Sequence, residues 1–286
     1  MVTIGNYLIK PVYLLEYSLE PALLSSPPKS TSLYALVIQL GAASQQIIPT
    51  INWGLHAQVM DWLSLGDTQI ADAIYRSQDT PFSLSELMGY RRQRETQPGD
   101  DFTFRISLLD GDLIDPLLKG IEQWGNKPLF FGQCSFVIRN IYTLPGTHPL
   151  ADSSDYAILA NTDKISDEIT LKFLSPTSFK QKREIQPFPL AELVFGSLLR
   201  RWNVFAPEEL KFPFVEWKGL VSAYKLKTHA FKLESSSEIG AKGWVIYCFQ
   251  EAEQAKIATT LAYFANFAGV GRKTAMGMGQ TCLVNS

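Results

Sequence analysis

Residues 269–284 have the sequence GVGRKTAMGMGQTCLV, which places four glycines within eleven positions and an Arg–Lys pair between them. A helical pattern of apolar residues precedes this segment, and a short β-prone run follows its last glycine. Glycines at such density let backbone N–H groups approach a ligand closely, and adjacent cations favour an anion. The segment therefore predicts a loop, between a helix and a last strand, that binds a phosphate-rich ligand. The alternative interpretation is a flexible turn without a ligand.

Two nucleotide-binding motifs can be tested against this loop. A P-loop needs glycine directly before the Lys-Thr pair, where this chain has Arg272. The dinucleotide motif G-x-G-x-x-G needs a third glycine where Thr274 stands. Both motifs run from strand to loop to helix, whereas this segment runs from helix to loop to strand. We therefore expect no nucleotide cofactor, and a nucleotide-binding enzyme of metabolism is the least favoured class.

The glycine spacing resembles that of the sixth Cas family, the CRISPR-associated repeat-processing endoribonucleases of the RAMP superfamily. Four glycines match the pattern G-x-G-x-x-x-x-x-G-x-G of that family: Gly269, Gly271, Gly277 and Gly279. Two upstream segments, SPTSF at 175–179 and PLAELVFGSLLRRW at 189–202, resemble the turn and helix after the opening strand of its second domain. The resemblance is strong over residues 169–284 and weak over 1–168.

Apolar periodicity predicts two halves of similar plan, each with the order βαββαβ. In the first half we expect strands near 33–38, 82–87, 102–108 and 130–142, helices at about 51–62 and 113–124, and a small extra helix near 68–77. In the second half we expect strands at 169–174, 217–233, 244–249 and 276–284, and helices at 190–202 and 251–268. A Pro-Gly segment at 145–149 and the polar run 152–167 suggest a linker.

The resemblance implies a fold and a reaction for this plan. The fold class is α+β, with two tandem ferredoxin-like (βαββαβ, RRM-like) domains over residues 1–148 and 149–286 that face each other across a cleft. The reaction is metal-free cleavage of CRISPR precursor RNA within each repeat, leaving a 2′,3′-cyclic phosphate and a 5′-hydroxyl. The expected partners are this repeat RNA and other CRISPR effector subunits, with no membrane and no DNA contact. The expected RNA-binding residues of the loop are Gly269, Gly271, Arg272, Lys273, Thr274, Gly277 and Gly279.

The catalytic candidate is one of three histidines in the chain. His56 lies beside the apolar stripe of the first predicted helix, and that position alone favours a histidine at the edge of the core. The resemblance reverses this preference, because the catalytic histidine of the family lies near the start of the same helix, in a context like Leu55-His56. Histidine has an unperturbed pKa of about 6.5, so it can remove a proton from the 2′-hydroxyl or give one to the departing 5′-oxygen.

The chain departs from the family in the residues that assist the histidine. Some relatives supply a tyrosine from the loop before the first helix, where this chain has Ser44, Gln45 and Gln46. Some also supply a lysine one or two turns after the histidine, but here no Lys or Arg follows before Arg76. A second hypothesis is therefore a catalytically inactive RAMP-family subunit that binds guide RNA in an effector complex.

A second basic surface is predicted on the strand near residues 223–231. Alternation places four residues on one face, where cations beside an aromatic ring suit a single-stranded RNA: Lys225, Lys227, His229 and Phe231. The alternative is a solvated lysine face. Arg200 and Arg201 are expected to end a helix and complement its dipole. Lys180, Lys182 and Arg183 are expected to form a basic loop that clamps RNA or stays hydrated.

Composition narrows the remaining possibilities. The chain has 286 residues, 46% of them hydrophobic, which suits one large domain or two ordinary ones. Its net charge is only −2, yet residues 169–231 carry ten Lys/Arg against five Glu, and such a local surplus attracts phosphate. Three distant cysteines without a CxxC pair exclude a disulfide framework and a recognisable zinc site, so no metal ligands are predicted. With no signal peptide or long apolar run, we expect a cytoplasmic protein.

Overall fold

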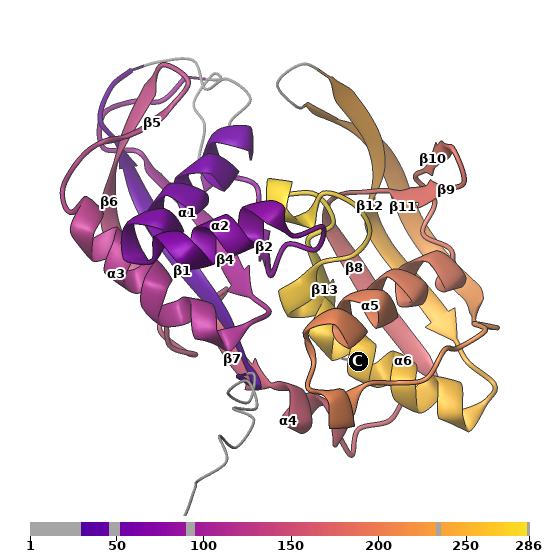
Figure 1. Cartoon of the computed structure of the whole chain (residues 1–286). Coiled ribbons are helices and arrows are strands. Elements are labelled where there is room, and N and C mark those ends of the chain that lie inside the picture. The colour runs from indigo at the N-terminus through magenta and orange to yellow at the C-terminus, as the bar shows by residue number, and fades with distance from the viewer. Residues whose placement is uncertain (1–29, 46–51, 90–94, 233–235, 285–286) are drawn as a thin grey trace, which may run out of the picture.

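The computed structural model describes residues 30–45, 52–89, 95–232 and 236–284. Two lobes lie side by side, each a sheet with helices packed against it, and the glycine-rich loop lies between them (Figure 1). Expectations for Gln46 and Ile51, and the start of the first helix, fall outside the described residues.

The first lobe is a ferredoxin-like domain. Its elements are β1 (Ser32–Ala42), α1 (Asn52–Gly66), α2 (Thr68–Arg76), β2 (Phe82–Leu84), β3 (Met88–Gly89), β4 (Asp101–Leu108), η1 (Gly111–Leu113), α3 (Ile114–Trp124), β5 (Leu129–Phe131), β6 (Cys134–Tyr142) and β7 (Asp152–Asp155). The strands follow the order β2-β4-β1-β6-β5, with β4 and β6 both antiparallel to β1. Counting only the four strands of the βαββαβ unit, this order is 2-3-1-4, the arrangement that the unit requires.

The second lobe repeats this arrangement. Its elements are α4 (Tyr156–Ala160), β8 (Glu168–Thr177), β9 (Phe179–Gln181), β10 (Glu184–Gln186), α5 (Ala191–Phe205), η2 (Glu208–Leu210), β11 (Leu220–Lys232), β12 (Ser237–Cys248), α6 (Ala252–Ala268), η3 (Thr274–Met276) and β13 (Thr281–Leu283). The sheet order β11-β12-β8-β13 is again 2-3-1-4. The tandem ferredoxin-like fold predicted from the periodicity and the resemblance is confirmed.

Two predicted segments differ clearly from the structure. The last strand begins only at Thr281, because Gly277 and Gly279 have positive φ and interrupt any extended run before it. The polar run at 152–167 is not a plain linker, since it contains β7, which pairs with β1, and the helix α4. Strand β7 lies after residue 148 in the chain but pairs with β1 of the first sheet. The domain boundary between residues 148 and 149 stays a prediction.

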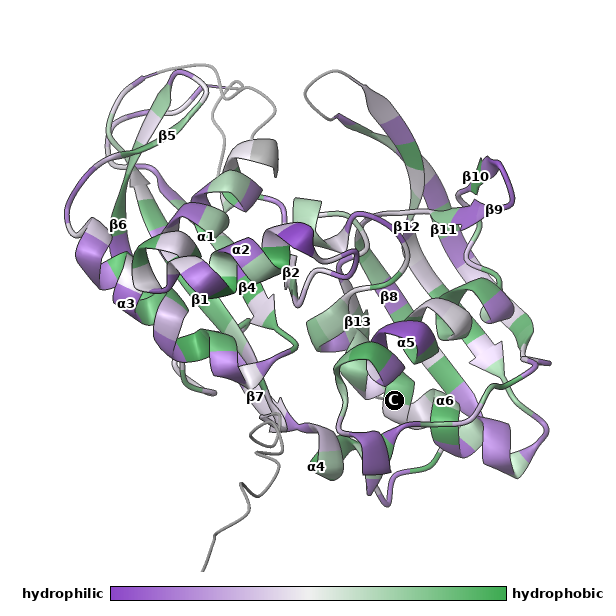
Figure 2. Ribbon diagram, in the orientation of Figure 1, coloured by the Kyte–Doolittle hydropathy of each residue, from purple (hydrophilic) through white to green (hydrophobic). Residues whose placement is uncertain are grey.

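Strand β1 connects the two hydrophobic cores. Leu36, Ile38 and Leu40 pack into the core beneath α1 and α3, whereas Leu33 and Ala35 belong to the core of the second lobe. Hydrophobic residues recur along the strands and helices of both lobes (Figure 2). Each fully buried aliphatic side chain stabilises the fold by roughly 1.5–3 kcal/mol relative to exposure. Packing on both faces of β1 therefore favours a fixed arrangement of the two lobes.

Polar contacts between the lobes add to this packing. The Ser83 hydroxyl donates to the carbonyl oxygen of Phe267 over 2.5 Å, and the guanidinium of Arg105 donates to the carbonyl oxygen of Asn266. The carbonyl acceptors lie near the C-terminal end of α6, directly before the glycine-rich loop. These bonds hold the loop against the first lobe. None of the described helices is long and apolar enough to cross a membrane.

Candidate RNA-binding and catalytic site

His56 and the glycine-rich loop, 219 residues apart in the chain, are in direct contact. His56 lies in the second turn of α1 and is half-buried. Its Nδ1 is 3.1 Å from the carbonyl oxygen of Ala275, which lies in the turn η3 of the loop. The imidazole also lies against the ring of Phe82, with 5.5 Å between the ring centroids. The structure thus brings together the catalytic candidate and the predicted RNA-binding loop.

These contacts determine the chemical state of the imidazole. A carbonyl oxygen can only accept, so Nδ1 carries the proton and the basic nitrogen of the neutral ring is Nε2. Burial lowers the pKa of His56 below its ordinary value of 6.5, and the hydrogen bond to Ala275 offsets part of that effect. A ring with a lowered pKa is neutral near pH 7. It is therefore better suited to accept a proton than to donate one.

The glycines of the loop permit close backbone packing. Gly269, Gly271, Gly277 and Gly279 all have positive φ. A Cβ on Gly279 would lie 2.0 Å from the carbonyl oxygen of Val270, and one on Gly271 would lie 2.4 Å from that of Ser178. No side chain fits at those distances. The glycine pattern is therefore explained by the fold of the loop itself, whether or not a ligand binds.

Most N–H groups of the loop are already bonded within the protein. That of Val270 donates to Gly279, that of Gly279 to Pro176 and that of Arg272 to Ser178. Among the residues that the structure describes, only three N–H groups between 269 and 280 have no acceptor: those of Lys273, Thr274 and Ala275. The expectation that glycine N–H groups face a ligand is therefore wrong for most of the loop. The groups that remain lie at η3, beside His56.

The two cations of the loop share one buried carboxylate. Lys273 Nζ is 2.9 Å and Arg272 Nη1 is 3.6 Å from the carboxylate oxygens of Glu238, whose side chain is 8% exposed. Burial works to raise the pKa of Glu238, but the Ser178 hydroxyl and the two cations together hold it below its ordinary value. The two cations and this carboxylate together therefore carry a net charge of about +1. Glu238, in β12, was not identified from the sequence.

The predicted basic face of β11 is exposed along most of its length. Lys225, Lys227 and His229 are exposed, as expected. Phe231 is buried, so it is not the stacking ring that the sequence suggested. Its ladder partner on β12 is Glu238, which pairs with the loop cations, so the glycine-rich loop covers this end of the face. The basic face therefore leads directly to the loop.

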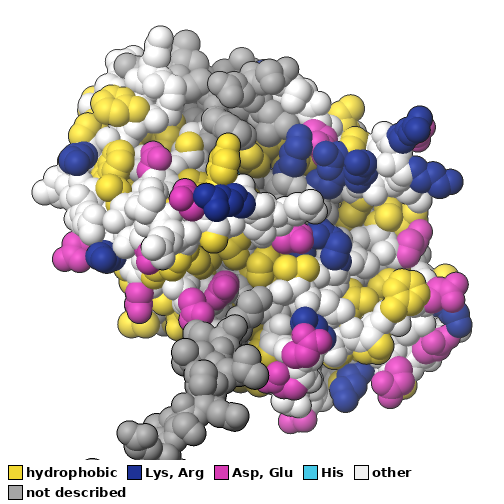
Figure 3. All heavy atoms as spheres, viewed as in Figure 1, with side chains coloured by type: hydrophobic (Ala, Val, Ile, Leu, Met, Phe, Trp, Pro, Cys, Tyr) yellow, Lys and Arg dark blue, Asp and Glu magenta, His cyan; other side chains and the backbone are white. Residues whose placement is uncertain are grey.

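Lys242 extends this face and was not identified from the sequence. It lies opposite Lys227 in the β11–β12 ladder, so both side chains project from the same face of the sheet. Its Nζ is 3.8 Å from the carboxylate of Glu86 in the first lobe. Lys and Arg side chains gather over this hairpin and over the neighbouring β9–β10 turn (Figure 3). The cationic surface thus reaches the junction of the two lobes.

The described residues that stand where some relatives have the assisting tyrosine have other partners. Ser44 Oγ is 3.3 Å from Ser135 Oγ, and Gln45 donates to Glu95 over 3.1 Å. The described part of the chain contains no group of three or more His, Cys, Asp or Glu residues that could hold a metal ion. No assistant to His56 of the kind seen in some relatives is identified among these residues.

Arg201 was assigned to the end of a helix, and this assignment is wrong. α5 continues to Phe205, so Arg201 lies on its buried face, in line with Val194, Leu198 and Phe205. Its guanidinium donates to the Thr274 hydroxyl and to two carbonyl oxygens of the first lobe. The sequence does contain a signal for this burial, because Arg201 falls on the apolar stripe of the helix. Arg200 is exposed instead and pairs with Asp79 over 2.6 Å.

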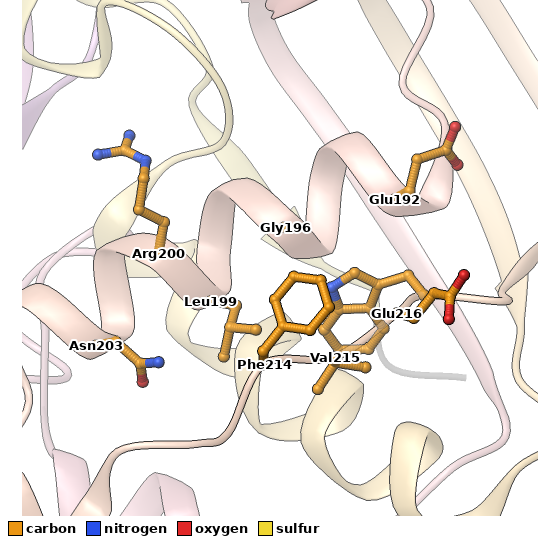
Figure 4. Close-up of a pocket in the computed structure, with 9 residues that line it drawn as sticks. Glu192, Gly196, Leu199, Arg200, Asn203, Phe214, Val215 and Glu216 are labelled. Carbon is orange, nitrogen blue, oxygen red and sulfur yellow. The ribbon is translucent and has the colours of Figure 1, made fainter.

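Two hollows on the surface lie apart from this site. A groove of about 560 Å³ runs along α5 beside residues 214–217, with the ring of Phe214 at its rim (Figure 4). A groove of about 700 Å³ lies between the lobes and is lined by Arg105, residues 145–152 and residues near Gln280. The second hollow corresponds to the predicted cleft, but the loop and His56 touch each other rather than face across it.

Known proteins share this architecture and part of this sequence. Residues 171–281 match the family model described as CRISPR-associated endoribonuclease Cas6. A curated relative, the CRISPR-associated endoribonuclease Cas6 of Streptococcus thermophilus, is 25% identical over 125 residues, which are 42% of this chain and 51% of the relative. A solved Cas6 product complex has a TM-score of 0.72 at 27% identity and covers 89% of this chain and 100% of that one. The chain is therefore similar to Cas6 endoribonucleases, in sequence over residues 171–281 and in fold over most of its length.

A further Cas6 product complex has the same fold as this chain. Its TM-score is 0.77 at 23% identity, with 89% of this chain and 100% of that chain covered. The chain spans about half the length of the curated relative that it matches (51%). The similarity in sequence centres on the second lobe, whereas the similarity in structure extends over both lobes. The first lobe, which carries His56, is thus related to Cas6 chiefly by its fold.

Proposed function

We propose that this chain is a metal-independent endoribonuclease that cleaves CRISPR precursor RNA within its repeats to give guide RNAs. The observation that carries the proposal is the 3.1 Å contact between His56 Nδ1 and the Ala275 carbonyl, which joins a titratable side chain to the loop of the second lobe. Similarity to Cas6 supports the substrate class, because the relatives are named CRISPR-associated endoribonucleases.

His56 is assigned the role of general base. With Nδ1 donating to Ala275, Nε2 accepts the proton of the ribose 2′-hydroxyl. The 2′-oxygen attacks the adjacent phosphorus, the bond to the 5′-oxygen breaks, and that oxygen leaves with a proton from solvent. The products are a 2′,3′-cyclic phosphate and a 5′-hydroxyl. Because this reaction uses a nucleophile within the RNA, it needs no metal-activated water.

The backbone of the RNA is assigned to two adjoining surfaces. The N–H groups of Lys273, Thr274 and Ala275 are the donors of the loop that remain for a phosphate beside His56. Lys225, Lys227 and His229 project from β11 toward solvent and provide a path for the strand that leads to this point. Single-stranded RNA on such a path is held mainly by its phosphates.

Cleavage of a synthetic repeat RNA in excess chelator tests the proposal. We expect cutting with a 2′,3′-cyclic phosphate on the upstream product, and no cutting when the nucleotide before the cut carries hydrogen in place of its 2′-hydroxyl. The deoxy substrate should still bind. Cleavage of the deoxy substrate, or cutting that requires a divalent cation, would contradict the mechanism. Binding without any cutting would favour the second hypothesis, an inactive subunit that binds guide RNA. The lack of a lysine after His56 in α1 supports that hypothesis.

Lys273→Ala is expected to weaken RNA binding and to flatten its dependence on salt. Each phosphate neutralised on a single strand contributes about 0.7 to the slope of log K against log salt concentration, so the slope should fall by about that amount. Filter binding of the deoxy substrate at several salt concentrations measures it. Lys256→Ala is the matched control, because this exposed lysine lies on α6 about 20 Å from the loop along the helix. An unchanged slope would mean that Lys273 serves only to hold Glu238.

A further inference from the structure

Two chain segments fix the position of the His56 ring. One is η3, whose Ala275 carbonyl accepts from Nδ1, and the other is the start of β2, where the ring of Phe82 lies against the imidazole. These segments belong to different lobes and are far apart in the chain. The orientation of His56 therefore depends on whatever holds η3 and β2 at a fixed distance from each other.

The side chain of Arg201 binds both segments. Its Nη1 donates to the hydroxyl of Thr274, the neighbour of Ala275, and its Nη2 donates to the carbonyl oxygens of Thr80, over 3.2 Å, and Phe82, over 3.5 Å. Because the guanidinium is planar and its donors are fixed relative to one another, it sets the spacing of these acceptors as a lysine could not. A single side chain from α5 thus connects both neighbours of the catalytic ring.

The burial of this cation argues that the arrangement serves more than stability. Arg201 is 7% exposed, and in the described part of the chain its Nε has no acceptor. Burial, with the charge of Arg200, lowers its pKa to about 10, so it stays charged at neutral pH. A buried cation with an unsatisfied donor costs stability relative to an apolar side chain at the same place. The neighbouring stripe residues Leu198 and Phe205 are of that apolar kind.

We propose that Arg201 is a positioning residue for cleavage: through Thr274 and the Phe82 carbonyl, it holds the Ala275 carbonyl where it keeps the His56 proton on Nδ1. This assigns the Thr274 hydroxyl to the protein, although the sequence assigned Thr274 to RNA. Thr274 is 4% exposed, in agreement with that assignment. The inference rests on the proposed function only for its effect on rate, because the tautomer of His56 is a property of the free protein.

Thr274→Val tests the inference with little change in shape, since it removes the acceptor of Arg201 and keeps the branched side chain. We expect the single-turnover cleavage rate to fall by about 10- to 100-fold, the scale of a small misplacement of a reacting group. The affinity for the deoxy substrate should fall by much less than the rate, because the variant keeps the backbone N–H groups of η3 and the cations of β11. In the free full-length protein, the ¹⁵N resonances of His56, identified by their loss in His56→Ala, should change from the Nδ1-protonated form to a mixture of tautomers.

Two further variants separate positioning from general loosening. Thr274→Ser keeps the hydroxyl and should restore both the rate and the ¹⁵N spectrum. Arg200→Gln removes the exposed ion pair between the lobes but touches neither η3 nor β2, so it should behave as the wild type. A wild-type spectrum in Thr274→Val, or the same spectral change in Arg200→Gln, would overturn the inference. If the wild type cuts no RNA, the proposed function fails, and the spectra alone still decide this inference.

Discussion

Replacing His56 with alanine is expected to lower the single-turnover cleavage rate of a repeat RNA by about a hundred- to ten-thousand-fold, the usual contribution of a positioned general base. Affinity for the RNA should be nearly unchanged, because in the proposed mechanism the imidazole contacts only the reacting hydroxyl and the neighbouring cations bind the phosphates. Rapid-quench measurement of the cleavage rate, with filter binding of the deoxy substrate, separates the two quantities.

The matched control is His148→Ala, which removes the same side chain from a turn between the lobes, where its Nδ1 accepts from the N–H of Leu150. This variant should cut at the wild-type rate. In the wild type, the rate should rise with pH through a midpoint below 6.5, because burial lowers the pKa of His56 and a base acts in its neutral form. A variant His56→Ala that retains more than a tenth of the rate, or an acidic limb centred above 6.5, would exclude His56 as the base.

The fold was predictable because its signals are local. Alternating and helical apolar patterns lie within single elements, such as β8 or α6, and each pattern depends only on which faces are buried. The order of those elements then leaves few topologies. The exceptions occur where glycines act: the strand expected from residue 276 cannot form, since the positive φ of Gly277 and Gly279 produces a turn there instead.

The site was predictable only in part, because its geometry depends on contacts between distant residues. The glycine pattern and His56 could be recognised separately, but the hydrogen bond that joins them spans 219 residues. Phe231 is buried, and its ladder partner Glu238 pairs with the cations of the glycine-rich loop. Neither fact can be derived from alternation along one strand. Arg201 was misplaced because the helix, expected to end at residue 202, continues to Phe205 and so includes Arg201 in its interior.

Gly279→Ala is expected to destabilise the loop more than any other single methyl group added to it. The residue has φ of +70°, and its new Cβ would lie 2.0 Å from the carbonyl oxygen of Val270, whose own N–H donates to Gly279. A left-handed alanine costs roughly 1–2 kcal/mol and an overpacked site roughly 1–3 kcal/mol, so the free energy of unfolding should fall by about 2–5 kcal/mol. Urea unfolding of the full chain measures this change.

Gly277→Ala isolates the steric part of that loss. Gly277 also has positive φ, +95°, but the nearest atoms to its added Cβ are 3.4 Å away, at Ser85 and Glu86 of the first lobe, which is ordinary contact. The free energy of unfolding of Gly277→Ala should therefore fall only by the cost of a left-handed alanine, roughly 1–2 kcal/mol. Equal losses in the two variants would show that the loop backbone shifts to admit the methyl group of Gly279→Ala. In that case, the close approach of residues 270 and 279 does not fix the position of η3 beside His56.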